Sequence, residues 1–417
     1  MRIRHIPSIV IFSLLLLLGA SASAQPKPRQ LSQFPAEAQS TVWTQLAELT
    51  ASDAAGNVAL GYSVAISGNT VAVGAPYETI GANEHQGAVY VFTKPASGWS
   101  NMTQTAKLTV SDETLSGELG FSVAFSGKTI VAGAPGSNAA YVFVEPAGGW
   151  ADTQTPNAKF TDPGDEAVFG VSVAISGNAI AVGVPSSDSQ GIAQGVVCVY
   201  LKPAGGWATT TSYKALLTAS DGAYANLGYS VSISGNTIVA GDPGSNTSQG
   251  ASYVFVKPAT GWTSMTQTAK LTASDGMPYD DFGDAVAVGG TVIVVGAPNA
   301  VTGTEFGKAY LFVEPSGGWA NATQTAALLA SDAHSGAQFG WSTAVWGNMV
   351  AVGAFAGSTY GYRMPATGWT NMPESVELTG TQAAGQGHAT AIGASMIVAG
   401  AFDTDNGIGA AYVFGPK

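Results

Sequence analysis

The stretch Gly228–Pro243, GYSVSISGNTIVAGDP, contains two short strand patterns separated by a tight turn. In Tyr229–Ile233, large and small residues alternate with the period of two that is typical of a β-strand. Gly235 and Asn236 tolerate positive φ angles, which suits a two-residue hairpin turn. The stretch is therefore predicted to form a β-hairpin.

The same pattern recurs seven times along the chain. Its first strand follows a glycine in an FG-like element, and the seven copies of that glycine are Gly61, Gly120, Gly170, Gly228, Gly283, Gly340 and Gly387. Its second strand ends in GAP or a near form, and the corresponding glycines are Gly74, Gly133, Gly183, Gly241, Gly296, Gly353 and Gly400. A third strand resembling GAVYVF and a fourth ending like AKLTASD complete each copy. A repeat of roughly 50 to 60 residues is typical of propeller blades rather than of leucine-rich or helical repeats.

The strands alternate bulky with small residues instead of apolar with polar ones. Val64 and Ile66 point to one side, while Ser63 and Ala65 point to the other. This pattern favours sheets that are covered on both faces, because a sandwich with one wet face would carry charged residues outward. The fold predicted is all-β, a seven-bladed β-propeller of four-stranded blades.

Tryptophans mark the fourth strand, and their spacing indicates how the two ends of the chain meet. Six of them precede a fourth strand: Trp99, Trp150, Trp207, Trp262, Trp319 and Trp369. Because they share one register, they are interpreted as packing residues and not as separate sugar sites. The fourth strand of the seventh copy is found at the other end of the chain, around Trp43. Residues 41–51 are therefore predicted to complete the last blade.

The N-terminus has the pattern of an export signal. A basic start, a short apolar run and an Ala22-Ser23-Ala24 end predict a signal peptide over residues 1–24, cleaved near Ala24. Residues 25–40 are interpreted as a flexible leader, and the mature chain is expected to be secreted, either extracellular or periplasmic. The formal net charge of −12, with no basic run, argues against nucleic-acid binding. We expect no membrane span and a monomer.

The paired FG and GAP elements resemble those of FG-GAP repeat proteins, which include the integrin α-subunit propeller and many exported bacterial proteins. The resemblance covers residues 41–417 and implies an extracellular interaction or adhesion module. Several blades of that family bind calcium in an acidic loop between their first two strands. Here that loop is only Ser67-Gly68-Asn69 or similar, which is too short to surround the ion with six or more oxygens. No cofactor is therefore expected, and calcium is not carried over to these loops.

Ligand contacts are expected on the face formed by the segments before each FG element and after each GAP element, because these segments vary in length and content. The face is acidic, with turn residues such as Asp53, Asp112, Asp221, Asp275 and Asp332. These acids are interpreted either as turn caps or as a recognition surface for a basic protein partner or for cations. The ligand-face candidates are His85, His334, Trp341, His388, Asp403 and Asp405. Asp403, Asp405 and His388 are also considered for a cation, although DTDNG lacks the distal Glu of a calcium loop.

Three functions remain open from the sequence. The first is a secreted, non-enzymatic binding or adhesion module that presents its acidic loops to an extracellular or cell-surface protein. The second is a carbohydrate-binding, lectin-like propeller, and the third is an enzyme that acts on polysaccharide. Catalysis is disfavoured because the chain has no GxSxG, HExxH or CxxC motif, and because the inner-strand serines have no adjacent base.

Overall fold

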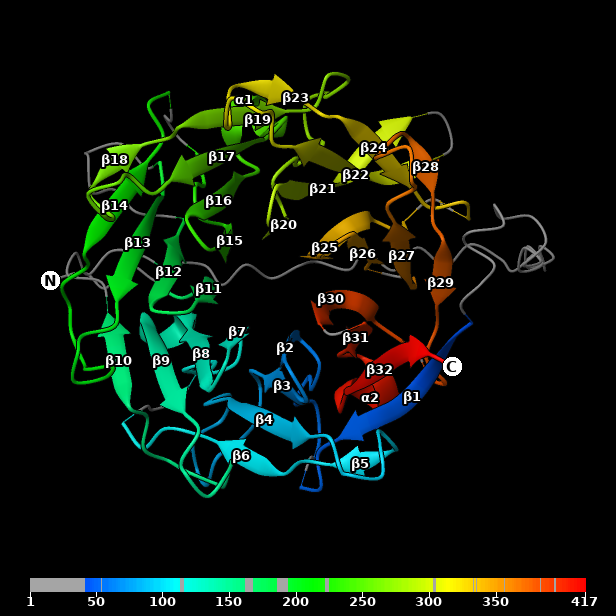
Figure 1. Ribbon diagram of the computed structural model, residues 1–417. Coiled ribbons are helices and arrows are strands. Elements are labelled where there is room, and N and C mark those ends of the chain that lie inside the picture. Colours follow the sequence, from blue (N-terminus) through cyan, green and yellow to red (C-terminus); the bar gives the residue numbers. More distant parts are fainter. Residues whose placement is uncertain are drawn as a thin grey trace, which may run out of the picture.

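The computed structural model describes residues 42–417, apart from positions 54, 113–115, 162–167, 186–193, 222–224, 303–304, 333, 335, 356, 383 and 394. The predicted signal peptide and leader lie outside the described residues. The described chain is all-β, and its sheets are blade-like (Figure 1). None of the described helices is long and apolar enough to cross a membrane.

The strands form antiparallel units of four, which are numbered here in chain order. The hairpin predicted from Gly228–Pro243 is confirmed as β15 and β16 of unit 4, with Gly235 at a φ of 56° in the turn. The first four units are unit 1 with β2 (Ser63–Ser67), β3 (Thr70–Ala75), β4 (Ala88–Thr93) and β6 (Ala106–Leu108); unit 2 with β7 (Ser122–Ser126), β8 (Thr129–Ala134), β9 (Ala139–Val144) and β10 (Ala158–Thr161); unit 3 with β11 (Ser172–Ser176), β12 (Ala179–Val184), β13 (Val196–Leu201) and β14 (Ala215–Thr218); and unit 4 with β15 (Ser230–Ser234), β16 (Thr237–Asp242), β17 (Ala251–Val256) and β19 (Ala269–Thr272).

The remaining units continue this order. They are unit 5 with β20 (Val286–Gly289), β21 (Val292–Thr302), β22 (Glu305–Val313) and β24 (Ala326–Leu329); unit 6 with β25 (Phe339–Trp346), β26 (Met349–Ala354), β27 (Thr359–Arg363) and β29 (Val376–Leu378); and unit 7 with β30 (Gln386–Gly393), β31 (Met396–Ala401), β32 (Ala410–Pro416) and β1 (Trp43–Thr50). The short helical segments are η2 (Pro135–Ser137), α1 (Ser245–Ser248) and α2 (Thr404–Gly407).

Unit 7 is completed by the N-terminal strand, as predicted from the tryptophan register. Strand β1 pairs antiparallel with β32, from Trp43 opposite Pro416 to Leu49 opposite Ala411. The two ends of the described chain therefore lie in one sheet (Figure 1).

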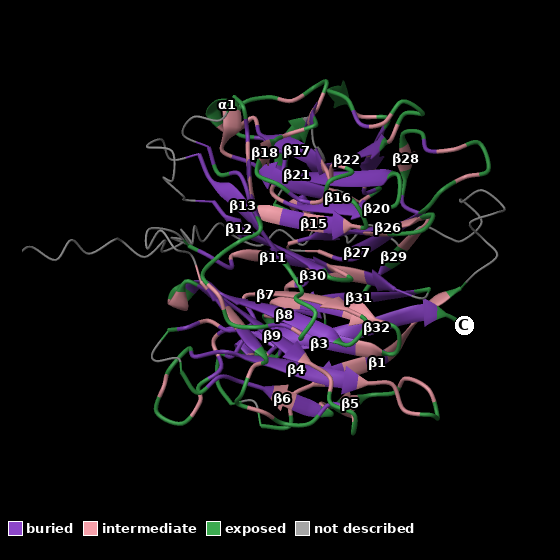
Figure 2. Ribbon diagram, turned by 60° about the vertical axis from the view of Figure 1, so that its left-hand side comes forward, coloured by how far each residue is buried: buried purple, intermediate pink, exposed green. Residues whose placement is uncertain are grey.

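Neighbouring units contact one another through their first strands, which lie nearest the centre in Figure 1. Strand β2 contacts β7, each following first strand contacts the next, and β30 contacts β2. The second and third strands are almost fully buried between units, and the connecting loops are exposed (Figure 2). Cys198 is 1% exposed in the core between units 2 and 3.

Short parallel strands connect the outer edges of neighbouring units. They are β5 (Met102–Thr103), which pairs with β1; β18 (Met265–Thr266), with β14; β23 (Ala322–Thr323), with β19; and β28 (Met372–Pro373), with β24. Single parallel bridges from Leu108 to Thr153 and from Phe160 to Thr210 make the same connection at two further junctions.

Candidate functional site

The residue after each FG glycine has the same place in every unit, and glycine geometry fixes that place. The seven FG glycines all have positive φ, from 88° at Gly387 to 102° at Gly283, a range that favours glycine. Each GAP glycine also lies against the FG glycine of the next unit. A Cβ added at Gly74 would stand 1.9 Å from the carbonyl oxygen of Gly120, and one added at Gly400 would stand 1.9 Å from that of Gly61. The backbones of neighbouring units thus approach too closely for any side chain.

Inner-strand serines support the same arrangement. The Oγ of Ser63 donates a hydrogen bond to the carbonyl oxygen of Gly120 in the next unit at 2.7 Å. Four further serines donate equivalent bonds, namely Ser122 to Gly170, Ser172 to Gly228, Ser230 to Gly283 and Ser342 to Gly387. These hydroxyls join neighbouring units, which is a structural role.

An aromatic cluster occupies this end of the molecule and spans units 6, 7, 1 and 2. We call it the aromatic mouth, and it consists of Trp341, Phe355, His388, Phe402, Tyr62, Tyr77 and Phe121. The Tyr62 ring lies 4.5 Å from that of His388 and 4.8 Å from that of Phe121, measured between centroids. The His388 ring lies 4.7 Å from Phe402 and 5.8 Å from Trp341. All seven side chains are half-buried, so the mouth is a continuous ring surface that solvent partly reaches.

Tyr62, Tyr77 and Phe121 were not among the predicted ligand-face residues, and two further members of the aromatic mouth were missed as well, Phe355 and Phe402. They stand where the GAP element of most units has proline, so units 6 and 7 contain GAF instead. The Phe355 ring lies 4.6 Å from that of Trp341, and the two phenylalanine rings lie 5.9 Å apart. The change from GAP to GAF in adjacent units was the signal that could have identified them.

His388 is neutral at the centre of the aromatic mouth. Its Nδ1 lies 2.9 Å from the carbonyl oxygen of Tyr62. A carbonyl oxygen only accepts, so Nδ1 carries the proton and Nε2 retains a lone pair. Burial lowers the pKa of His388 to about 4, although the bond to Tyr62 acts in the opposite direction. The ring therefore remains uncharged near pH 7 and can accept one hydrogen bond.

Two acidic side chains have raised pKa values at this end of the molecule: Glu118, which acts on Tyr62 of the aromatic mouth, and Asp284, which acts on Tyr229. Burial, together with the nearby Asp281, raises the pKa of Asp284 to about 7. This carboxyl holds the FG position of unit 5, next to Tyr229 of unit 4, whose pKa it raises. Burial also raises the pKa of Glu118, against the opposing effect of His85. These two carboxyl groups therefore take up a proton at a higher pH than an exposed carboxyl group does.

Most of the predicted acidic turn residues are engaged within the fold. Asp53 accepts a hydrogen bond from the Tyr90 hydroxyl at 3.1 Å and forms an ion pair with Lys107 at 2.7 Å. Burial acts to raise the pKa of Asp53, but the Lys107 and Tyr90 contacts hold it below its usual value. Asp112, Asp221 and Asp275 form equivalent lysine pairs, while Asp332 accepts a hydrogen bond from Tyr360. These aspartates are therefore paired turn residues, and little of their charge is available to a partner.

The structure brings three of the six predicted ligand-face residues into one region. Trp341 and His388 belong to the aromatic mouth, and the exposed His85 reaches it through Tyr77, whose ring is 5.3 Å away. His334, Asp403 and Asp405 are exposed, and no described contact joins them to the mouth. Within the described ranges, no group of three or more His, Cys, Asp or Glu side chains is placed to hold a metal ion.

Comparison with known proteins identifies the repeat. The FG-GAP repeat model matches residues 43–92, 102–143, 212–255, 265–312 and 322–366, which is more than half of the chain. The chain belongs to the FG-GAP repeat family. This family is typically non-enzymatic, mediates protein binding and is usually extracellular.

The other comparisons add less. The crystal structure of the computationally designed Ika8 protein is similar at 17% sequence identity and a TM-score of 0.49, covering 86% of this chain and 84% of that one. No curated protein matches the chain.

Proposed function

We propose that this FG-GAP protein is a secreted, non-enzymatic binding module. Its units would form a closed seven-bladed β-propeller over residues 41–417, exported by a signal peptide over residues 1–24. The contacts of β30 with β2, of Gly400 with Gly61 and of β1 with β32 support closure. The module would bind an extracellular or cell-surface protein through the aromatic mouth.

The aromatic mouth is the observation that carries this proposal. Binding energy at protein interfaces concentrates in a few residues, among which Trp and Tyr are enriched. The rings of Tyr62, His388 and Phe402 are tilted against one another by 49–71°, so they present an uneven apolar surface. Such a surface suits apolar side chains of a protein better than the flat face of a sugar ring. The proposed contact surface therefore differs from the acidic loops favoured by the sequence alone.

A carbohydrate ligand is the second candidate. Trp341 and Tyr62 are aromatic, and the ring of His388, which packs against both, can accept a hydrogen bond at Nε2. Sites for sugars commonly combine an aromatic ring with a few convergent polar groups. This combination is the reason to test both ligand classes together.

The test is affinity capture on the immobilised mature chain, residues 25–417, from envelope and matrix extracts. Eluates of the wild type are compared with those of Trp341→Ala and Phe402→Ala, and with a Tyr213→Ala control at a solvent-exposed ring outside the mouth. We expect a defined protein that both mouth variants lose and the control retains. Elution of polysaccharide that simple sugars displace would favour the second candidate. Capture that neither mouth variant alters would refute the aromatic mouth as the contact surface.

A further inference from the structure

Six junctions between neighbouring units contain a tryptophan from the turn before the fourth strand. Five of these side chains are only 2–9% exposed: Trp150, Trp207, Trp262, Trp319 and Trp369. The sixth, Trp99, packs between units 7 and 1, and its indole N–H contacts the sulfur of Met396 at 3.0 Å. Met396 is the first residue of β31, the second strand of the preceding unit. Each of these junctions therefore accommodates an indole at a defined place.

The junction between units 6 and 7 is built differently, because the outer strand of unit 7 is β1. Ala47 in β1 has the same position in unit 7 that Ala106 in β6 has in unit 1. The residue that precedes Ala47 by as many positions as Trp99 precedes Ala106 is Ser40, so the sequence has a serine where the other units have the turn tryptophan. This junction also differs at its outer edge. At the other six junctions a short parallel pair connects the outer strands of the two units, whereas among the described residues no strand pair connects β29 to unit 7. We call this junction the seam.

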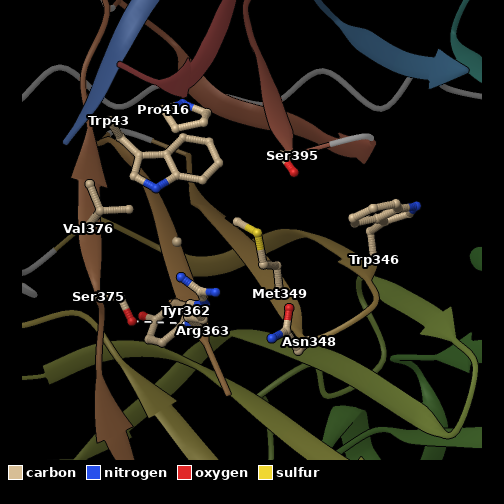
Figure 3. Close-up of a pocket in the computed structure, with 11 residues that line it drawn as sticks. Trp43, Trp346, Asn348, Met349, Tyr362, Arg363, Ser375, Val376, Ser395 and Pro416 are labelled. Atoms are coloured by element: carbon tan, nitrogen blue, oxygen red, sulfur yellow. Dashed lines mark hydrogen bonds between the residues drawn. The ribbon is translucent and has the colours of Figure 1, made fainter. Parts of the chain in front are cut away.

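The described residues leave a cavity of about 280 Å³ at the seam (Figure 3). Trp43, Tyr362 and Val376 form apolar walls, and Trp346 stands at its edge, 48% exposed. Met349 also lines it, as the first residue of β26 and thus in the position that Met396 has beside Trp99. Sites for drug-sized ligands usually begin near 300 Å³, so this cavity suits one large side chain.

A positive charge lies beside the cavity. Arg363 lines it at the end of β27, and its side chain is exposed. Its backbone N–H donates to the Oγ of Ser375 at 3.1 Å, as the dashed line in Figure 3 marks. In the part of the chain that the structure describes, no carboxylate lies within ion-pair distance of the guanidinium. An arginine at the mouth of an apolar cavity favours a carboxylate, which it can bind in bidentate geometry.

We propose that the seam is a docking site for a tryptophan of a second protein, carried in a segment with an acidic residue beside it. The indole fills the cavity, and its N–H contacts the Met349 sulfur as Trp99 contacts Met396. The neighbouring carboxylate pairs with Arg363. The proposal is independent of the aromatic mouth, because no residue is shared between the two surfaces.

The probe is N-acetyl-tryptophan, which combines an indole with a carboxylate, titrated against the mature chain by ligand-observed NMR. We expect saturable binding with a Kd on the order of 1 mM, as a single side chain provides modest affinity. N-acetyl-tryptophanamide, which lacks the carboxylate, and the variant Arg363→Glu should each weaken binding about fivefold or more. Met349→Leu should weaken it as well. The matched control Met396→Leu, at a junction that already contains Trp99, should bind the probe as the wild type does.

Three outcomes would overturn the proposal. The first is the absence of saturable binding to the wild type. The second is binding that survives both Arg363→Glu and Met349→Leu, and its loss with Trp341→Ala would then place the probe at the aromatic mouth. The third concerns Phe34, an aromatic residue in the sequence that precedes Trp43. Binding seen only in the Phe34→Ala variant would assign the cavity to this same chain and not to a partner.

Discussion

The spacing between neighbouring units is set by glycine. Gly74 and its six counterparts lie against the FG carbonyl of the next unit, with room for no Cβ. The hairpin glycine Gly68 has positive φ, but nothing lies within 4 Å of the Cβ that it lacks. One glycine is thus required by a close approach and the other by the conformation of a turn.

This difference predicts unequal costs for the same substitution. Gly74→Ala should lower the free energy of unfolding by about 3 kcal/mol or more, because the new methyl group overlaps the Gly120 carbonyl. Gly68→Ala should cost only about 1–2 kcal/mol, the strain of a left-handed alanine. Urea unfolding of both variants measures the costs. Equal losses would show that the units separate readily at Gly74.

His388 makes stability depend on pH. Its folded-state pKa of about 4 lies below the value near 6.5 expected in the unfolded chain. As pH falls from 6.5 towards 4, the unfolded state takes up a proton that the folded state does not, so stability is lost in this window.

Replacing the imidazole should remove that loss. Between pH 7 and pH 4.5, the unfolding free energy of His388→Phe should fall by about 2 kcal/mol less than that of the wild type. Urea unfolding at the two pH values measures the difference, and His334→Phe, at an exposed ring, serves as the control. If the wild type and His388→Phe lost stability in parallel, His388 would not be buried as a neutral ring.

The turn tryptophans act at the scale of elements, because each one belongs to one unit and packs against the unit before it. Trp262, 2% exposed, belongs to unit 4 and lies in a core cluster with Ala174, Val197 and Leu217 of unit 3. This cluster is the buried core between two facing sheets, so the turn tryptophans help to hold neighbouring units face to face.

The contribution of the turn tryptophans can be measured by truncation. Trp262→Ala should lower the free energy of unfolding by about 3–5 kcal/mol, since a fully buried indole is lost. Trp346→Ala should stay within about 0.5 kcal/mol, because that ring is 48% exposed. Thermal unfolding checks both, and a small loss at Trp262 would mean that the junction collapses around the missing ring.

The elements were predictable from the sequence, whereas the site was predictable only in part. Period-two alternation and turn glycines are local signals, so the hairpins and the outer strand around Trp43 could be assigned from the repeat. His388 was identified because the chain has only four histidines, and Trp341 because it lies outside the register of the turn tryptophans. Phe355 and Phe402 were not identified, because their place in the aromatic cluster depends on ring contacts between units. The pairing of Asp53 with Lys107 was missed for the same reason, since these residues are far apart in the chain.

At the scale of the whole molecule, β1 determines whether unit 7 has its fourth strand. Ala47 and Leu49 are fully buried in the core between units 7 and 1, so removing β1 exposes both units. Deleting the residues up to and including Thr50 should therefore lower the Tm of the protein by at least about 10 °C. Adding a peptide of residues 42–51 should restore part of the loss, as differential scanning fluorimetry would show. A scrambled peptide is the control, and an unchanged Tm on truncation would mean that unit 7 is stable with three strands.

The pairing of Trp43 with Pro416 has a mechanical consequence. These residues begin β1 and end β32, so a pulling force applied through both would open the antiparallel pair from that end. The hydrogen bonds of the pair would then break one after another, as in a zipper, and not all at once as in shear. Tension along the backbone would therefore peel β1 from unit 7 at low force. A tether through only one of the two ends would not pull Trp43 and Pro416 apart from each other, so an adhesive role under flow would favour attachment by a single terminus.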